Sequence, residues 1–289
     1  MLWGAFPLYW PLLEPAAPLE ILAHRILWSL AFVAVLLCYT HGWSRVRAVL
    51  GNRSQRTTLA LAAVVISVNW LTYIWGVNTH HIVETSLGYF INPLFTILLG
   101  VVVLREKLRL AQWVAVGIAS LAIVVLTVNY GRLPWIALTL ALSFGTYGYL
   151  KKRANVGAVE SLAVETGVLA GPALIVLAVL QMTGSIAFLH HSVGNTVLLM
   201  LTGVVTAVPL LFFAASAIRL PLSTLGLLQY LAPVFQFLIG VLVAHEPLPP
   251  ARLAGFALVW FALVLLTVDG LRYSRREATA LPSPVDIAS

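Results

Sequence analysis

The chain has 289 residues, of which 61% are hydrophobic and only 9% charged, with a formal net charge of +7. Its mean hydropathy is +0.97. Soluble domains are about half apolar and a quarter charged, so this composition excludes a water-soluble fold. The basic residues stand in short clusters between apolar stretches, which indicates membrane topology rather than nucleic-acid binding.

Apolar stretches follow one another along almost the whole chain. A hydrocarbon core about 30 Å thick requires roughly 20 residues of helix. Such stretches predict an all-α integral membrane protein with ten transmembrane helices, near residues 1–13, 20–40, 58–78, 84–104, 108–128, 134–150, 161–182, 195–217, 222–244 and 251–270. The first stretch is too short to cross alone, so we expect either a start further upstream or a truncated first helix.

Lysine and arginine are distributed unevenly between the two sides of this topology. Fourteen of the 17 fall on one side, only Arg132 and Arg252 fall on the other, and Arg25 lies inside a span. The positive-inside rule makes the basic side cytoplasmic. We therefore expect a multi-pass protein of the plasma (inner) membrane with a cytoplasmic C-terminus, and a disordered tail over residues 272–289.

The two halves of the chain match each other at an offset of 140 residues. The most informative matches are Pro93 with Pro233, Gly100 with Gly240, and Glu106 with Glu246. Five spans per half is an odd number, so the halves must be inserted in opposite senses. We predict two inverted five-helix repeats, over residues 1–130 and 131–271. Inverted repeats are typical of carriers that expose one midplane site alternately to each side.

Polar side chains form stripes along several predicted spans. In the ninth span, Gly226, Gln229, Pro233, Gln236 and Gly240 are spaced by three and four residues, which is one face of a helix. Such a stripe either packs helices closely or lines a wet cavity. Four amides exceed what packing needs, so we favour a substrate cavity for Asn69, Asn92, Gln229 and Gln236.

Several aromatic residues lie deep enough in the spans to contact a substrate rather than form an interfacial belt. These candidates are Trp70, Tyr73, Tyr89, Phe144, Tyr147 and Tyr230. The histidine pairs at 80–81 and 190–191 have no cysteine or paired carboxylate nearby, so we expect no metal site and no cofactor.

Ionisable residues inside spans are costly and therefore informative. The candidates for an intramembrane charge or coupling role are His24, Arg25, Glu84 and Glu165. Arg25 either extends outward to the interface or faces inward, where it would bind an anionic group or pair with a carboxylate. We hypothesise an Arg25–Glu84 pair. Glu165 either exchanges protons or anchors the end of its helix.

The chain also resembles a known family. The matching segments are His24-Arg25, Asn69-Trp70, the string from Ser86 to Pro93, Val208-Pro209-Leu210 and the string from Leu222 to Gly226. Over residues 3 to about 270 the chain resembles EamA-type members of the drug/metabolite transporter superfamily, and within them the RarD subfamily. The resemblance implies ten spans, two EamA repeats, a central cavity, and transport, often export, of small metabolites or drugs.

Together these features predict a secondary transporter that exports a small metabolite or drug by alternating access at a polar midplane cavity. No phosphate-binding glycine-rich loop is present in the sequence, so we expect no ATP-driven step. The spans show no clustered catalytic carboxylates and no His/Asp constellation at one membrane level, so we expect no enzyme activity. Its partners would be the substrate and the lipid bilayer, with either protons as coupling ion or plain facilitated exchange, and the chain could be a monomer or a homodimer. The alternatives are a membrane-embedded enzyme, which needs clustered catalytic groups, and a non-transporting sensor or scaffold, which needs an output domain.

Overall fold

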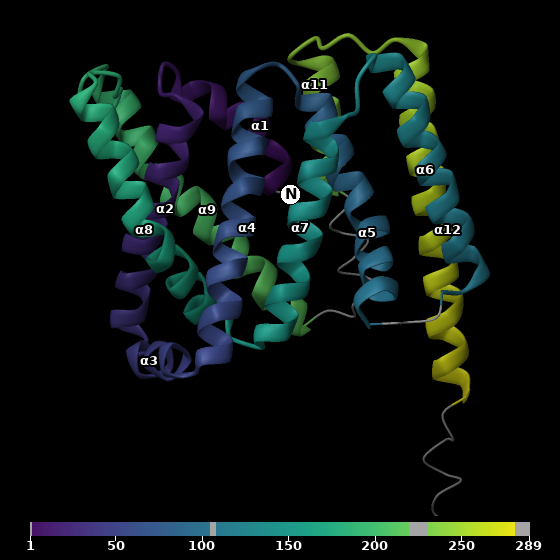
Figure 1. The fold of residues 1–289 in the computed structure, drawn as a ribbon, viewed down its shortest axis with the longest axis horizontal. Helices are drawn as coiled ribbons and strands as arrows, with labels where there is room; N and C mark the ends of the chain where they lie inside the picture. The colour runs from purple at the N-terminus through teal and green to yellow at the C-terminus, as the bar shows by residue number, and fades with distance from the viewer. Residues whose placement is uncertain (1, 105–107, 220–230, 281–289) are drawn as a thin grey trace, which may run out of the picture.

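The computed structural model describes residues 2–104, 108–219 and 231–280, and all regular secondary structure in these ranges is helical (Figure 1). The elements are η1 (Leu2–Ala5), α1 (Phe6–Tyr9), η2 (Trp10–Leu13), α2 (Pro18–Tyr39), α3 (Trp43–Gly51), α4 (Arg53–Asn78), α5 (Ile82–Leu104), α6 (Leu110–Tyr130), α7 (Trp135–Ala154), α8 (Ala158–Met182), α9 (Val193–Arg219), α11 (Leu231–Leu242) and α12 (Pro250–Ala280).

Six of the described helices are long and apolar enough to cross a membrane. Their spanning parts are Pro18–Tyr39, Arg53–Asn78, Leu110–Asn129, Ala158–Met182, Val193–Phe212 and Pro250–Arg272. The other four predicted spans correspond to the η1–α1–η2 segment, α5, α7 and α11. The protein is therefore a multi-pass membrane protein, and the total of ten spans stays a prediction.

Successive long helices run in opposite directions through the bundle (Figure 1). α6 and α12 pack side by side at one edge, and α2 packs against α8 and α9 at the other, with α4, α5 and α7 between them. We call the end that holds α3 the lower end and the opposite one the upper end. η1 begins near mid-height, so the η1–α1–η2 segment covers only the upper half of the bundle (Figure 1).

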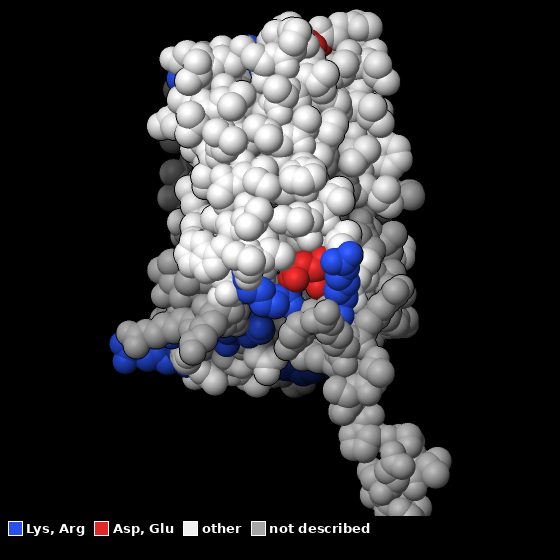
Figure 2. Space-filling view, turned by 90° about the vertical axis from the view of Figure 1, so that its right-hand side faces the viewer, with Lys and Arg blue, Asp and Glu red and all other residues white. Residues whose placement is uncertain are grey.

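The charge distribution matches a bilayer-spanning body. Figure 2 shows a broad band without charged side chains and, beneath it, Lys and Arg gathered towards the lower end. α3 lies at this end and carries Arg45 and Arg47. Water at the lower end solvates these cations, whereas the uncharged band can face acyl chains.

Local sequence explains where several helices begin and end. Pro18 stands at the start of α2, where its missing N–H costs nothing. The Asn52 side chain accepts hydrogen bonds from the N–H groups of Ser54 and Gln55, and so caps α4. Gly131 ends α6 in the left-handed conformation, at φ 66°, which a glycine adopts without strain.

Two glycines allow close contacts between helices. A Cβ at Gly88 would lie 2.8 Å from the Ala137 carbonyl oxygen, so α5 approaches the backbone of α7 directly. A Cβ at Gly203 would collide with the backbone of Trp28, which brings α9 equally close to α2. Small residues at such crossings are the usual means of helix packing in membranes.

Two sequence-based expectations about individual elements need correction, and one helix is additional to those predicted. The first stretch is not one helix but three short segments, because Pro7 and Pro11 interrupt its backbone hydrogen bonding. The basic segment after the second predicted span contains α3, an amphipathic helix in addition to those predicted. The predicted disordered tail is helical up to Ala280, because the sequence from 271 to 280 contains no glycine or proline and continues α12. Residues 281–289 lie outside the described part.

Candidate functional site

Arg25 lies inside the bundle, not at its surface. It stands about 10 Å below the start of α2, at 1.5 Å per residue, and is only 4% exposed. Its guanidinium carbon lies 4.2 Å from the ring centroid of Trp70, 5.2 Å from that of Trp10 and 5.8 Å from that of Phe6. Aromatic faces attract a cation, which offsets part of the cost of burial. Of the two interpretations of Arg25, the structure supports the inward-facing one.

The hypothesised Arg25–Glu84 pair is wrong. The Glu84 carboxylate accepts hydrogen bonds from Arg132, at 2.9 Å from Nη2, and from the Ile136 N–H at 3.2 Å. Arg132 precedes α7, whose N-terminus meets that of α5 at the upper end, so it reaches Glu84 directly. Arg25 is left without a carboxylate within 4.0 Å in the described ranges, and its Nε has no hydrogen-bond partner there.

Other buried polar groups around Arg25 also lack partners. Arg25 interacts electrostatically with the phenols of Tyr73 and Tyr89. The Tyr73 hydroxyl and the Trp10 Nε1–H make no hydrogen bond to any described residue, although Tyr73 is 2% exposed and Trp10 fully buried. Each buried polar group without a partner costs roughly 1–3 kcal/mol, so such groups call for a ligand or water. We call Arg25, Phe6, Trp10, Trp70, Tyr73 and Tyr89 the Arg25 cluster.

An aromatic line leads from this cluster towards the lower end. Ring centroids are 5.6 Å apart for Tyr73 and Tyr89, 5.8 Å for Tyr89 and Phe144, and 6.3 Å for Phe144 and Tyr147. Asn69 holds the line in place, because its Oδ1 accepts a hydrogen bond from the Tyr89 hydroxyl at 3.1 Å. Its Nδ2 donates to the Leu140 carbonyl and to Ser143 on α7.

The line ends at a fully partnered carboxylate. Glu165 accepts hydrogen bonds from the Tyr147 hydroxyl at 3.0 Å, Lys151 Nζ at 2.9 Å and Ser161 Oγ at 2.7 Å. Lys151 also donates to Ser161 and lies 5.5 Å from the Tyr147 ring centroid. Glu165 is therefore not the lone carboxylate that its sequence context predicted, since the last turn of α7 supplies it with a cation.

The remaining predicted site residues fall elsewhere. His24 accepts a hydrogen bond from the Trp28 indole at 3.2 Å, and its ring lies against that of Phe188 at an interplanar angle of 39°, away from the Arg25 cluster. Asn92 faces α7, where its Oδ1 would lie 3.2 Å from a Cβ at Gly145. Gln236 donates from Nε2 to the Trp3 carbonyl at 3.0 Å, and its Oε1 has no described partner. Gln229 and Tyr230 lie outside the described residues.

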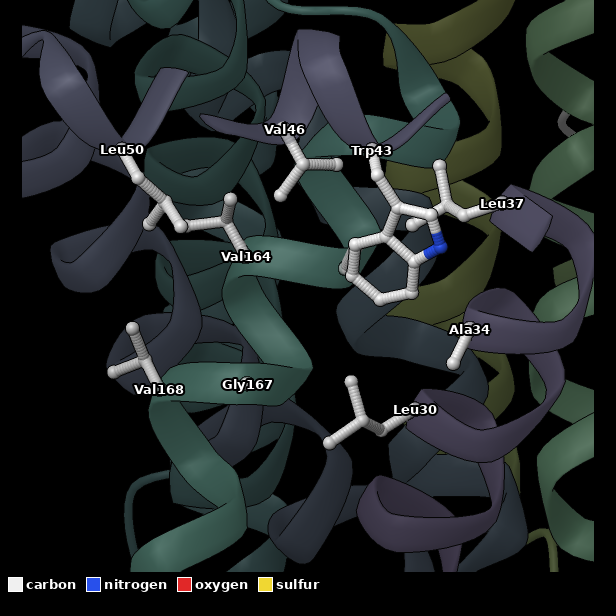
Figure 3. Close-up of a pocket in the computed structure, with 10 residues that line it drawn as sticks. Leu30, Ala34, Leu37, Trp43, Val46, Leu50, Val164, Gly167 and Val168 are labelled. Carbon is white, nitrogen blue, oxygen red and sulfur yellow. The ribbon is translucent and has the colours of Figure 1, made fainter. Parts of the chain in front are cut away.

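Among the described residues, two cavities open away from the Arg25 cluster. One, of about 390 Å³, lies between α2, α3 and α8 and is lined by apolar side chains such as Leu30, Val46 and Val168 (Figure 3). Its composition suits acyl chains rather than a polar substrate. The other, of about 280 Å³ at the upper end, is polar, and its lining includes His81, Glu84 and Glu246.

Comparison with known proteins identifies the family. Residues 1–128 match the EamA-like transporter family. Protein RarD from Streptomyces exfoliatus is 57% identical over 97% of this chain and 89% of its own length. The uncharacterized transporter YojE from Bacillus subtilis is 43% identical over 95% of this chain and 93% of its own. Protein RarD from Escherichia coli is 39% identical over 96% and 94%. The chain belongs to the RarD subfamily of EamA-like transporters.

The fold of this RarD-type chain is also shared with a solved protein. One crystal structure aligns over 94% of both chains with a TM-score of 0.60 at 18% sequence identity, which shows a common fold only. Family membership puts the RarD-type chain among membrane transporters of the drug/metabolite kind rather than among enzymes.

Sequence reasoning missed two residues of the site in this RarD-type chain. Phe6 and Trp10 contact Arg25, but the first stretch had been judged too short to span and its aromatics were not considered. Their spacing of four residues, at the depth of Arg25, is the signal that would have found them. Glu246 was expected at a helix terminus, but not that of α5, where it accepts hydrogen bonds from the N–H groups of Ile82 and Val83.

Proposed function

We propose that this protein is a secondary carrier that exports a small molecule by exposing a chamber, lined by the Arg25 cluster, alternately to the two sides of the membrane. The observation that carries the proposal is the set of buried polar groups without partners at Arg25, Tyr73 and Trp10. A bundle interior retains such groups where a ligand or water satisfies them. The outward direction is the one that the family resemblance implies.

Contacts between the halves support the inverted repeat. Glu20 at the start of α2 accepts hydrogen bonds from the N–H groups of Ala187 and Phe188, at 3.0 and 2.9 Å, near the upper end. Glu160, which stands 140 residues later at the start of α8, accepts one from Arg45 Nε at 2.5 Å near the lower end. Each carboxylate thus holds a segment of the other half, and the two do so at opposite ends, as two inverted modules would.

Coupling and the alternative functions belong to the same proposal. Proton exchange through Glu165 or His24 would drive the export, and plain facilitated exchange is the alternative to it. A membrane-embedded enzyme would need clustered carboxylates, whereas Glu20, Glu84 and Glu165 lie in three separate networks.

Transport is tested with the purified full chain in liposomes loaded with a defined pool of metabolites, with and without a pH gradient. We expect saturable efflux of at least one compound, absent from empty liposomes, and a rate that responds to the gradient if protons are coupled. Conversion of a compound without efflux would favour an enzyme and contradict the carrier.

Opposite insertion of the halves is tested in a Cys38→Ser background carrying Glu106→Cys or Glu246→Cys. A membrane-impermeant maleimide applied to intact cells should label position 246 and spare position 106, because the basic side is cytoplasmic. Labelling of both positions from one side would contradict the inverted repeat.

A further inference from the structure

The Arg25 cluster supplies a cation and polar donors but, among the described residues, no carboxylate to pair with the cation. We propose that it binds the carboxylate of a monoanionic organic substrate that has an apolar or aromatic body. The Arg25 guanidinium would neutralise the carboxylate, and the Tyr73 hydroxyl and Trp10 indole N–H would donate to it. This inference rests on the proposed carrier function, since it names the class of molecule that the chamber holds.

The state of Arg25 is the first step. A buried charge is expensive unless it is paired and hydrogen-bonded, and the rings of Trp70, Trp10 and Phe6 provide attraction without any in-plane acceptor. The Nε–H lacks a partner, and no carboxylate of the described ranges lies within 4.0 Å. A guanidinium presents a planar fork of donors that matches a carboxylate in the same plane.

The number of unpaired positive charges in the bundle sets the number of negative charges that the substrate should carry. The other cations that reach into the bundle have carboxylate partners: Lys151 contacts Glu165, and Arg132 contacts Glu84. Arg25 is the one buried guanidinium among the described residues without a carboxylate within 4.0 Å, so it compensates one negative charge. A phosphate dianion would bring a second charge into the bundle without compensation, which favours a monoanion.

The carboxylates of the described bundle argue against an amino acid. Glu20 is held by backbone N–H groups of Ala187 and Phe188, and Glu84 and Glu165 are held by their own cations. None of the three contacts the Arg25 cluster, so the cluster offers no carboxylate for the ammonium group of a zwitterion. The selected ligand carries a net negative charge.

The rings beside Arg25 define the rest of the ligand. Tyr73, Tyr89 and Phe144 lie edge to face, at interplanar angles of 65° and 88°, and continue away from the guanidinium. Such a surface packs against an apolar or aromatic body, while hydroxyls on its edge contribute polar contacts. A carboxylate at Arg25 with its apolar body along the aromatic line satisfies both parts of the site.

The test measures the binding of a series of ligands to the purified full chain in detergent. Binding is monitored by thermal unfolding and by quenching of tryptophan fluorescence. Phenylacetate is compared with phenylacetamide, phenethylamine, phenylalanine and phenyl phosphate, which keep the ring and change the charge. We expect phenylacetate to bind at least about tenfold more tightly than each of the others. Equal binding of phenylacetamide, or tighter binding of phenyl phosphate or phenylalanine, would overturn the inference.

Variants assign the effect to the residue. Arg25→Met should reduce phenylacetate affinity to that of the amide, and Arg25→Lys should fall between, because it keeps the charge and loses the fork. The matched control is Arg47→Met, on the exposed face of α3, which should bind like the parent protein. Unchanged phenylacetate binding in Arg25→Met would overturn the inference. If Arg25→Met does not fold, the ligand series on the parent protein decides alone.

The liposome assay separates this inference from the carrier function. Selective binding of phenylacetate without efflux of any compound would contradict the carrier function and support the anion site. Efflux of neutral or cationic compounds, with no selectivity for carboxylates, would support the carrier function and contradict the anion site.

Discussion

The Arg25 cluster and the Glu165 network are two buried ionic sites joined by one aromatic line, and they differ in how their charges are satisfied. Glu165 has three hydrogen-bond donors within 3.0 Å, one of them the Lys151 ammonium. Arg25 has aromatic rings around it and an Nε without a partner. A charge that is already paired stabilises the scaffold, whereas one that is desolvated and unpaired is retained for what it binds.

The largest expected change in stability follows from a substitution in the Glu165 network. Glu165→Gln should lower the free energy of unfolding by about 3 kcal/mol, because it leaves the Lys151 ammonium without its counter-charge inside the bundle. Thermal or denaturant-induced unfolding in detergent measures this loss.

Arg25→Met is the matched variant for that measurement. It removes a buried charge that has no carboxylate partner, so its free energy of unfolding should equal or exceed that of the parent protein. A larger loss of stability in Arg25→Met than in Glu165→Gln would reverse the comparison between the two sites.

A smaller effect separates the two neighbouring tyrosines of the line. Tyr89→Phe removes the hydroxyl that donates to Asn69 Oδ1 and should cost about 1 kcal/mol. Tyr73→Phe removes a hydroxyl without a described partner, so its stability should not fall, whereas its affinity for phenylacetate should. Equal losses of stability in both variants, measured by the same unfolding assay, would show that Tyr73 has a structural partner.

The smallest effect concerns Glu246, which caps α5 at the upper end, outside the spans. Burial raises the pKa of Glu246, although the backbone N–H groups of Val83 and Ile82 lower it in part. The folded protein then holds this proton more tightly than the unfolded chain does. The contribution of Glu246 to stability is therefore greatest below the usual glutamate pKa and falls as the pH rises through the raised one.

Comparison with Glu246→Gln isolates this dependence, because the amide does not titrate. The free energy of unfolding of the parent protein relative to the variant should decrease as the pH rises above the usual glutamate pKa of about 4.3. A relative increase as the pH rises would mean that the hydrogen bonds to Ile82 and Val83 outweigh burial.

The sequence alone was sufficient for the membrane class, most of the helices and the family. Spans such as 20–40 and 161–182 correspond to α2 and α8 within a few residues, because continuous apolar composition is a property of the segment itself. The uneven distribution of lysine and arginine is likewise visible in the sequence. The aromatic candidates Trp70, Tyr73 and Tyr89, which were chosen from the sequence, lie together in the structure.

The pairing of charged side chains could not be predicted in this way, because a sequence does not show which charges lie in contact. Glu84 was assigned to Arg25 on membrane depth alone, but the N-termini of α5 and α7 adjoin and bring Arg132 to it instead. Glu165 looked alone because its cation, Lys151, stands on another helix.

The sequence by itself therefore determined which segments are apolar helices and which residues share one face of a helix. Both follow from composition and helical period. Tertiary structure alone decided which buried charges are satisfied and which is not, because hydrogen bonds reach only about 3 Å and depend on how separate helices pack. That selection made Arg25, out of all the ionisable groups in the described spans, the centre of the proposed site.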